Sequence, residues 1–232
     1  MKKPPVLQFD DLQCGYGDTV VVRGVSGCTA PGRVLGILGR NGVGKSTLLK
    51  ALAGFLPMAG GTLAWAGQDL RALPPHARLA AGIAYAPQEN VVFGELSVEE
   101  NLWLHIGRRR DARYDTLFAR FPRLRERLAQ RAGALSGGER KLLSFARTMA
   151  LAAPLTMLDE PTEGVQPENI DRMAQCIHEA TAEGRSFIVV EQNLSFLEAI
   201  ASDVLVLDHG RCVLQGEMRA LGREALEAHL VV

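Results

Sequence analysis

The stretch Gly39-Arg40-Asn41-Gly42-Val43-Gly44-Lys45-Ser46 has the spacing of a phosphate-binding loop. Residues without a Cβ let successive backbone N–H groups point inward, so a glycine-rich loop can wrap around the oxygens of a triphosphate. Lys45 would place a cation on the β- and γ-phosphates, and Ser46 would offer its hydroxyl to Mg²⁺. The stretch therefore predicts a nucleotide site.

The segments on either side supply the context that such a loop requires. Residues 33–38 are a short apolar run, which predicts a buried strand. Residues 46–53 predict a helix whose N-terminal dipole faces the phosphates. The alternative is a glycine-rich turn that matches the pattern by chance, and the order strand, loop, helix argues against it.

Composition bounds the possible functions. The 232 residues include 26 basic and 26 acidic side chains, so no long-range field draws the chain toward nucleic acid or an anionic membrane. Hydrophobic residues make up 47%, yet no run approaches the roughly 18 apolar residues of a membrane span. We expect a single domain over residues 1–232 with an inserted subdomain, soluble by itself, and no nucleic-acid partner.

The amino terminus and the cysteines favour the cytoplasm. The chain begins with charged residues, as a signal peptide would. Residues 6–11, which follow, are too short and too acidic for the apolar part of a signal peptide. The four cysteines lack C-x-x-C spacing, which favours reduced thiols over a zinc site or redox pair.

The first 65 residues predict antiparallel strands. Residues 6–12 and 19–29 are expected to pair around a turn at 14–18, and a short strand at 62–65 should follow a turn at 59–61. Tyr16 stands between two glycines at the tip, where its ring could stack on a flat base. The alternative is a turn tyrosine with its hydroxyl in water.

Polar side chains follow two further predicted strands. Gln88 comes after the strand 82–86, where a neutral amide can reach a metal or a water. The strand 155–158 ends in Asp159 and Glu160. One carboxylate there can hold Mg²⁺ through water while the other takes a proton from attacking water, although an ordinary acidic strand end is the alternative.

A helical stretch, roughly 94–152, interrupts the α/β alternation and predicts an inserted helical subdomain. Ser97 and Glu100 form a capping box, and the basic run 107–111 predicts a solvated turn. Helices are expected at 114–121, at 122–131 and from Ser136 to residue 151.

The last of these helices begins unusually, with Leu135-Ser136-Gly137-Gly138-Glu139. Ser136 is a natural N-cap, but each glycine after it costs about 1 kcal/mol relative to alanine. We interpret the pair as bare backbone N–H groups at a helix start, which is a site for an anion.

The carboxyl-terminal part returns to α/β alternation. Strands are expected at 186–190, 204–207 and 212–215, and helices at 167–183, 194–201 and 223–230. The triplet Glu191-Gln192-Asn193 forms the loop after the first of these strands.

These motifs, taken in order, resemble those of ABC transporter ATPase subunits, and the likeness covers nearly the whole chain. The segments that carry the resemblance are residues 39–46, Gln88, 135–139, 155–160 and 191–193. The resemblance implies an α/β fold of the ABC ATPase type: a P-loop NTPase core of mixed sheet and helices, an antiparallel β-subdomain at the N-terminus and an inserted helical subdomain.

The resemblance also implies ATP and Mg²⁺ as ligands and a role for each matching residue. The ATP contacts would be Tyr16 on the adenine and, in the loop, Gly39, Asn41, Gly42, Gly44, Lys45, Ser46 and Thr47. The signature residues that close over ATP held by the opposite subunit would be Ser136, Gly137 and Gly138. The metal ligands would be Ser46, Gln88 and Asp159, and the catalytic residues Glu160 as general base with Gln88 and Gln192.

The same resemblance implies the assembly. Two ATPase subunits, identical or related, pair head to tail with each ATP clamped between one phosphate loop and the other signature. Opening and closing of this dimer drives transmembrane permease subunits, which work with a periplasmic or extracellular solute-binding protein. The ATPase would be cytoplasmic and peripheral on the inner face of the plasma membrane, touching it only through the permease.

Finer features resemble the ATPases of branched-chain amino acid importers and their urea or short-chain amide relatives. They lie at residues 121–127, 161–167 and 190–193. Within them, the segment 162–167 is more similar to the urea importer ATPases. Gln192 replaces the usual histidine and Gln166 the usual aspartate, and both replacements occur in this subgroup.

Three other interpretations remain open at this point. An ATPase of lipid or lipopolysaccharide export shares the motifs and a similar length. A non-transport ABC ATPase, of the DNA-repair or ribosome-bound kind, would carry a long coiled coil or two nucleotide domains, and residues 44–135 contain neither sustained heptads nor a second phosphate loop. A P-loop kinase would have no use for residues 135–139.

Overall fold

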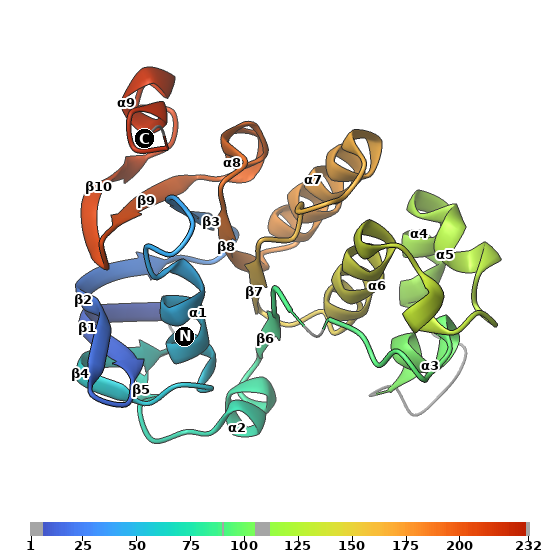
Figure 1. Cartoon of the computed structure of the whole chain (residues 1–232), viewed down its shortest axis with the longest axis horizontal. Helices are drawn as coiled ribbons and strands as arrows, with labels where there is room; N and C mark the ends of the chain where they lie inside the picture. Colours follow the sequence, from blue (N-terminus) through green and yellow to red (C-terminus); the bar gives the residue numbers. More distant parts are fainter. Residues whose placement is uncertain (1–6, 90, 105–111, 231–232) are drawn as a thin grey trace.

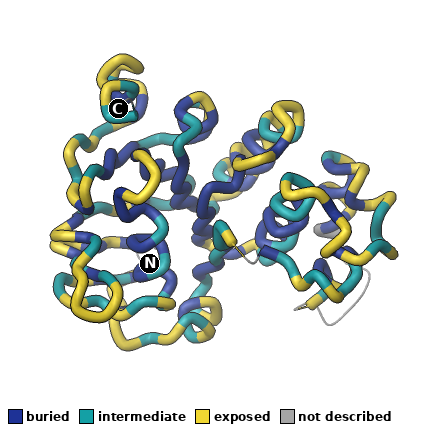
Figure 2. The backbone as a smooth tube through the Cα atoms, in the orientation of Figure 1, coloured by how far each residue is buried: buried dark blue, intermediate teal, exposed yellow. Residues whose placement is uncertain are grey.

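Two sheets and a group of helices make up the structure, a computed structural model that describes residues 7–89, 91–104 and 112–230 (Figure 1). The basic run predicted as a turn at 107–111 lies outside the described residues. Buried chain gathers along the central strands and on the helices beside them, while the outer loops are exposed (Figure 2).

The first sheet is antiparallel, with the strand order β2-β1-β4-β5. Its strands are β1 Leu7–Tyr16, β2 Thr19–Thr29, β4 Met58–Trp65 and β5 Gln68–Asp69. The predicted pairing of the first two strands is confirmed, with Leu7 opposite Thr29.

The two turns expected in this sheet have different outcomes. The turn expected at 14–18 is confirmed but shorter, at Gly17 and Asp18, because β1 continues to Tyr16, which pairs with Thr19. The turn expected at 59–61 is wrong, because β4 continues through these residues. Gly61 has a φ of 85°, and an ideal Cβ there would lie 2.4 Å from the carbonyl oxygen of Asp11. The glycines at this position therefore allow an irregular register against β1 instead of ending the strand.

The second sheet has six strands in the order β10-β9-β3-β8-β7-β6. They are β3 Val34–Leu38, β6 Ile83–Ala86, β7 Leu155–Asp159, β8 Ser186–Glu191, β9 Asp203–Asp208 and β10 Arg211–Glu217. All neighbours run parallel except β9 and β10. Every residue of β3, β7 and β8 is buried, as expected for parallel strands covered on both faces.

Helices cover both faces of this second sheet. The helix α1 (Lys45–Ala53) packs Leu48, Leu49 and Leu52 into a core shared with both sheets. A second core joins α7 (Pro167–Ala182) and α8 (Leu194–Ile200) to the helices that precede β7. The short helices α2 (Pro75–Ala80) and α9 (Arg223–Glu227) lie at the periphery.

The stretch between β6 and β7 is helical. It contains α3 Val98–Trp103, α4 Ala112–Arg120, α5 Pro122–Glu126, the 3₁₀ turn Ala132–Ala134 and α6 Gly137–Ala150. The helix expected over 122–131 ends at Glu126, because the chain then turns back and the carbonyl of Gln130 accepts a hydrogen bond from Val98 N at 2.9 Å. The helices α4 and α5 lie beyond α6, away from the sheets (Figure 1).

The parallel pairing decides where the polar strand ends meet. Leu38 pairs with Glu191, Asp159 with Val190 and Ala86 with Leu158. The carboxyl ends of β3, β8, β7 and β6 therefore lie in that order along one edge of the sheet, where open α/β folds bind ligands.

Candidate functional site at the carboxyl edge of the sheet

The phosphate loop connects β3 to α1 at this edge. Gly44, the residue before α1, has a φ of 107°, which a residue with a Cβ rarely adopts. A Cβ on Gly39 would lie 2.4 Å from the carbonyl oxygen of Leu207. Glycine is therefore required at the two positions for different reasons: Gly44 by its backbone conformation and Gly39 by lack of space for a side chain. Asn41 is exposed in the loop, and Thr47 is buried in the first turn of α1.

Lys45 is buried under this loop with its ammonium group fully engaged. Its Nζ donates to the carbonyl oxygens of Gly39 and Arg40, at 2.9 Å each, and lies 3.1 Å from Oε1 of Glu160. A lysine ammonium has three donors, and three oxygens surround this one. A phosphate oxygen can bind Lys45 only by replacing one of these partners.

Asp159 ends β7 beside Ser46. The Ser46 hydroxyl donates to Oδ1 of Asp159 at 2.9 Å, and the Tyr85 hydroxyl donates to Oδ2 at 3.2 Å. Burial raises the pKa of Asp159, and these two hydrogen bonds oppose the rise. Burial and the nearby Asp159 charge likewise raise the pKa of Tyr85.

Two adjacent hard oxygens, from Ser46 and Asp159, suit Mg²⁺ by donor chemistry. Within residues 7–89, 91–104 and 112–230, no group of three or more His, Cys, Asp or Glu side chains could hold a metal ion by itself. A magnesium ion held at Ser46 and Asp159 would therefore need further ligands from phosphate and water.

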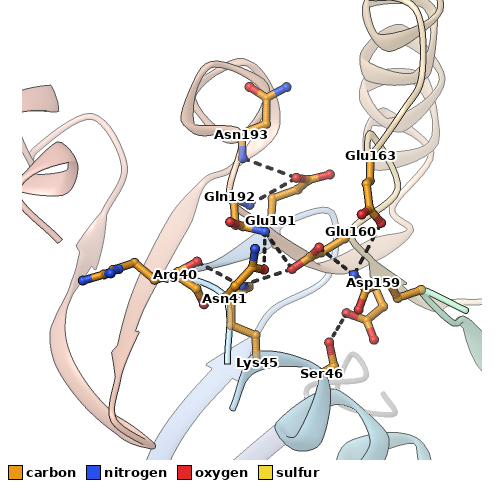
Figure 3. A network of polar contacts seen from close by, with 12 residues as sticks. Arg40, Asn41, Lys45, Ser46, Asp159, Glu160, Glu163, Glu191, Gln192 and Asn193 are labelled. Carbon is orange, nitrogen blue, oxygen red and sulfur yellow. Dashed lines mark hydrogen bonds and ion pairs between the residues drawn. The ribbon is translucent and has the colours of Figure 1, made fainter. Parts of the chain in front are cut away.

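Glu160 lies at the centre of a polar network (Figure 3). Gln88 Nε2 donates to Oε2 at 2.8 Å, and Gln192 Nε2 donates to Oε1 at 3.3 Å and to Asn41 Oδ1 at 2.7 Å. The Glu160 backbone has a φ of 46°, a strain of roughly 1–3 kcal/mol for a residue other than glycine. The structure thus brings Asn41, Lys45, Gln88 and Gln192 together around one buried carboxylate.

Glu191 has a role that the sequence did not reveal. Its Oε1 accepts hydrogen bonds from the backbone N and the hydroxyl of Thr162, at 2.9 and 2.8 Å. Its Oε2 accepts from the backbone N of Gln192 and of Asn193, at 3.2 and 3.3 Å. Burial raises the pKa of Glu191, and the hydrogen bonds oppose the rise. Glu191 therefore ties the loop after β7 to the loop after β8, and its one sequence signal is a charge at the end of a buried strand.

The profile of the family described as ABC transporter matches residues 22–163, more than half of the 232-residue chain. The match contains the phosphate loop, Gln88, residues 135–139 and Glu160. The chain belongs to the ABC transporter family. It is an ATP-binding ATPase subunit, and such subunits work on membrane permeases.

Two relatives of this ABC ATPase match over nearly their full length. The high-affinity branched-chain amino acid transport ATP-binding protein BraG of Pseudomonas aeruginosa is 35% identical over 220 residues, covering 93% of this chain and 94% of its own. The probable branched-chain amino acid transport ATP-binding protein LivF of Archaeoglobus fulgidus is 34% identical over 229 residues, with 93% and 94% coverage. A solved ATP binding subunit of an ABC transporter has a TM-score of 0.83 at 26% identity, covering 96% of this chain and 98% of its own.

The signature of the ABC ATPase lies at the start of α6, and Ser136 caps this helix as predicted. Its hydroxyl accepts from Glu139 N at 3.3 Å, and Glu139 accepts from Ser136 N at 2.9 Å. The hydrogen bond from Ser136 N to the carboxylate lowers the pKa of Glu139. In Figure 1, α6 and α1 lie on opposite sides of β7, and among the described residues no hydrogen bond joins Ser136, Gly137 or Gly138 to the cluster around Glu160.

The two signature glycines differ in whether their surroundings leave room for a side chain. A Cβ on Gly138 would lie 2.3 Å from the carbonyl oxygen of Gly164, so close packing requires this glycine. A Cβ on Gly137 would meet nothing within 4 Å. Packing within the chain is therefore a sufficient reason for a glycine at position 138, and the anion site expected at the two backbone N–H groups stays a prediction.

Tyr16, at the end of β1, has half of its surface exposed (50%). The sheet to which it belongs lies against the phosphate loop, because a Cβ on Gly44 would be 3.2 Å from a methyl group of Val21 in β2. The Tyr16 ring is thus accessible on the sheet that borders the loop. None of the helices in the described part of this ABC ATPase combines the length and the apolar content that a bilayer crossing needs.

Proposed function

We propose that this chain hydrolyses ATP in an importer that takes up branched-chain amino acids, or related small solutes such as urea and amides, through separate permease subunits. The observation that carries the ATPase site is the convergence of Lys45, Gln88 and Gln192 on the buried carboxylate of Glu160. The solute class is supported by the names of BraG and LivF. The same names make lipid export the weaker alternative.

Glu160 is the general base in this proposal. Its carboxylate takes a proton from the water that attacks the γ-phosphate, while the neutral amides of Gln88 and Gln192 keep the carboxylate and the water aligned. Lys45 exchanges Glu160 for phosphate oxygens, which leaves Oε1 free to accept the proton.

Ser46 and Asp159, with Gln88 at the neighbouring strand end, would hold Mg²⁺. When bound, this ion neutralises charge on the β- and γ-phosphate oxygens. Tyr85 keeps Asp159 oriented by its hydrogen bond to Oδ2. Tyr16 would cover the adenine with its exposed ring.

Two copies, or this chain and a related ATPase, would complete each site. Ser136 and Gly137 are exposed at the start of α6, and α6 and α1 lie on opposite sides of β7 in Figure 1. A head-to-tail pair with two-fold symmetry brings these two residues to the nucleotide of the opposite subunit, so that ATP holds the interface together. Loss of the γ-phosphate then loosens the pair.

The permease would dock on residues 88–97, beside the helical stretch. Phe93 is 58% exposed there. The Arg147 guanidinium lies 6.0 Å from the Phe93 ring, and its Nη2 donates to Val91 O at 2.9 Å. An exposed aromatic ring suits a helix that presents an apolar face.

In this proposal the subunit works on the cytoplasmic face, in contact with the membrane only through the permease, with a solute-binding protein on the other side. The test is reconstitution in liposomes with the permeases and binding protein encoded beside it, and measurement of ATP hydrolysis. We expect stimulation by a binding protein loaded with leucine, valine or isoleucine, or with urea or an amide. Stimulation by lipopolysaccharide or lipid, with none by these solutes, would reject the importer.

A further inference from the structure

Lys141, in the second turn of α6, contacts the loop that carries Glu160. Its side chain is 11% exposed, and its Nζ donates to the backbone carbonyl oxygen of Glu160 at 3.0 Å. The same Nζ lies 3.4 Å from Oε2 of Glu163, whose side chain is 60% exposed. Lys141 thus holds the backbone of Glu160, while the Glu160 carboxylate contacts Lys45 and Gln88.

The backbone of Glu160 needs such support, because its φ of 46° is in the left-handed region that side chains disfavour. Glu160 N donates to Val190 O in β8 at 2.9 Å, and Glu160 O accepts from Lys141 in α6. The two peptide groups that flank this strained residue are therefore held by two different elements. Their positions set the direction in which the Glu160 side chain leaves the backbone.

The helix α6 packs on the same loop at a second point. Gly138 approaches Gly164 so closely that a Cβ would be 2.3 Å from its carbonyl oxygen. The start of α6 and the turn after Glu160 are consequently in direct contact, and Lys141 adds a charge-assisted hydrogen bond one turn further along.

We propose that Lys141 is a positioning residue for Glu160, which keeps the Glu160 carboxylate aimed at the attacking water by fixing its left-handed backbone to α6. This inference rests on the proposed function, in which Glu160 is the general base. Because α6 begins with the signature, a shift of this helix against the opposite nucleotide moves the Lys141 contact with Glu160. Lys141 therefore connects the closing of one nucleotide site to the chemistry of the other.

The test compares Lys141→Met with Lys141→Arg in the assembled transporter, by steady-state ATP hydrolysis and by equilibrium binding of ATP. Methionine keeps the aliphatic stem and removes the donor, whereas arginine keeps a donor. We expect Lys141→Met to lower kcat roughly ten- to hundredfold, because small misplacements of a catalytic group have effects of this size. KM and ATP affinity should stay within about twofold, and Lys141→Arg should recover most of the loss.

Arg223→Met is the control, since it removes an exposed cation of α9 that pairs with Glu227, and its kcat should match the parent. A parent-like kcat in Lys141→Met overturns the inference, as does an equal loss in kcat and ATP affinity without recovery by arginine. If Lys141→Met does not fold, Lys141→Gln, whose amide is too short for the same contact, is measured in its place. Glu160→Gln separates the two proposals: parent-like turnover in that variant rejects Glu160 as the base, whatever Lys141 does.

Discussion

Lys45 and Glu160 form a buried ion pair, with 3.1 Å between Nζ and Oε1 and side chains that are 3% and 6% exposed. The residue expected to bind phosphate and the residue expected to activate water are thus each other's partner. In the proposed mechanism a triphosphate replaces Glu160 as the partner of Lys45, so the pair restrains both groups until the nucleotide arrives.

Glu160→Gln is expected to reduce turnover by a factor of about 10² or more, because an amide cannot accept the proton of water. ATP should bind at least as tightly as to the parent, since the change leaves the buried Lys45 without an anionic partner and phosphate supplies one. The variant should accumulate as an ATP-bound dimer, which size-exclusion chromatography with ATP and Mg²⁺ detects. Glu168→Gln, at an exposed glutamate of α7 paired with Arg172, is the matched control. Parent turnover in Glu160→Gln would show that another group is the base.

The two signature glycines should respond differently to alanine. Gly137→Ala should fold with an unchanged or slightly higher melting temperature, because its Cβ meets nothing and alanine favours a helix by about 1 kcal/mol. It should nevertheless weaken the ATP-dependent dimer, in which this Cβ would face the opposite nucleotide. Gly138→Ala should lower the melting temperature without nucleotide, because its Cβ would lie 2.3 Å from Gly164 O. Thermal unfolding of both variants tests the difference, and equal melting temperatures would contradict it.

Gln192→His should be tolerated, whereas Gln192→Ala should lose turnover. The Gln192 amide reaches both Asn41 and Glu160, and such a neutral hydrogen bond contributes roughly 1 kcal/mol net. If the bond strengthens in the transition state, alanine should lower turnover about tenfold or more, with ATP affinity changed less. The measurement is the rate of ATP hydrolysis and the ATP affinity of both variants in the assembled transporter. Hydrolysis by the alanine variant at the parent rate would reduce Gln192 to a structural residue.

Glu191 should make stability depend on pH. Burial raises its pKa above the ordinary 4.5, although hydrogen bonds from Thr162 and its neighbours oppose the rise. An acid with a higher pKa in the folded state binds its proton more tightly there, so its contribution to stability falls as the pH rises from the unfolded to the folded pKa. The parent's free energy of unfolding, minus that of the non-titrating Glu191→Gln, should therefore decline from pH 4.5 upward and then level off. Urea unfolding at several pH values measures this difference, and an increase with pH would have the wrong sign.

Single cysteines at Val92 and Phe93 should crosslink to cytoplasmic loops of the permease. Phe93 is exposed, Val92 is partly buried against the core of the helical stretch, and both follow Gln88 closely in the chain. Cysteines at residues 210–215, on the hairpin of β9 and β10, serve as the comparison surface. Crosslinking confined to residues 210–215 would place the permease elsewhere.

Much of the fold followed from local patterns. The strand before the phosphate loop, the helix after it and the acidic end of β7 were predicted, because each depends on residues within one short segment. The turn expected at 59–61 was wrong for the opposite reason. Gly60 and Gly61 do not end β4, because it pairs with β1 on both sides of an irregularity in register, and β1 is distant in sequence.

The sequence by itself thus predicted residues for phosphate, metal and water, since motif spacing carries that chemistry. Only the tertiary structure decided how they pair. Tyr85 meets Asp159 from 74 residues away, Gln88 meets Glu160 from 72, and Gln192 meets Asn41 from 151. The contacts of Lys141 and Glu191 could not be predicted from their own segments, because Lys141 donates to the backbone carbonyl of Glu160 and Glu191 accepts from the backbone N and hydroxyl of Thr162, both distant in sequence. Such contacts arise when parallel strands align their carboxyl ends and α6 packs against the loop after β7, which is a property of the packed chain and of no single segment.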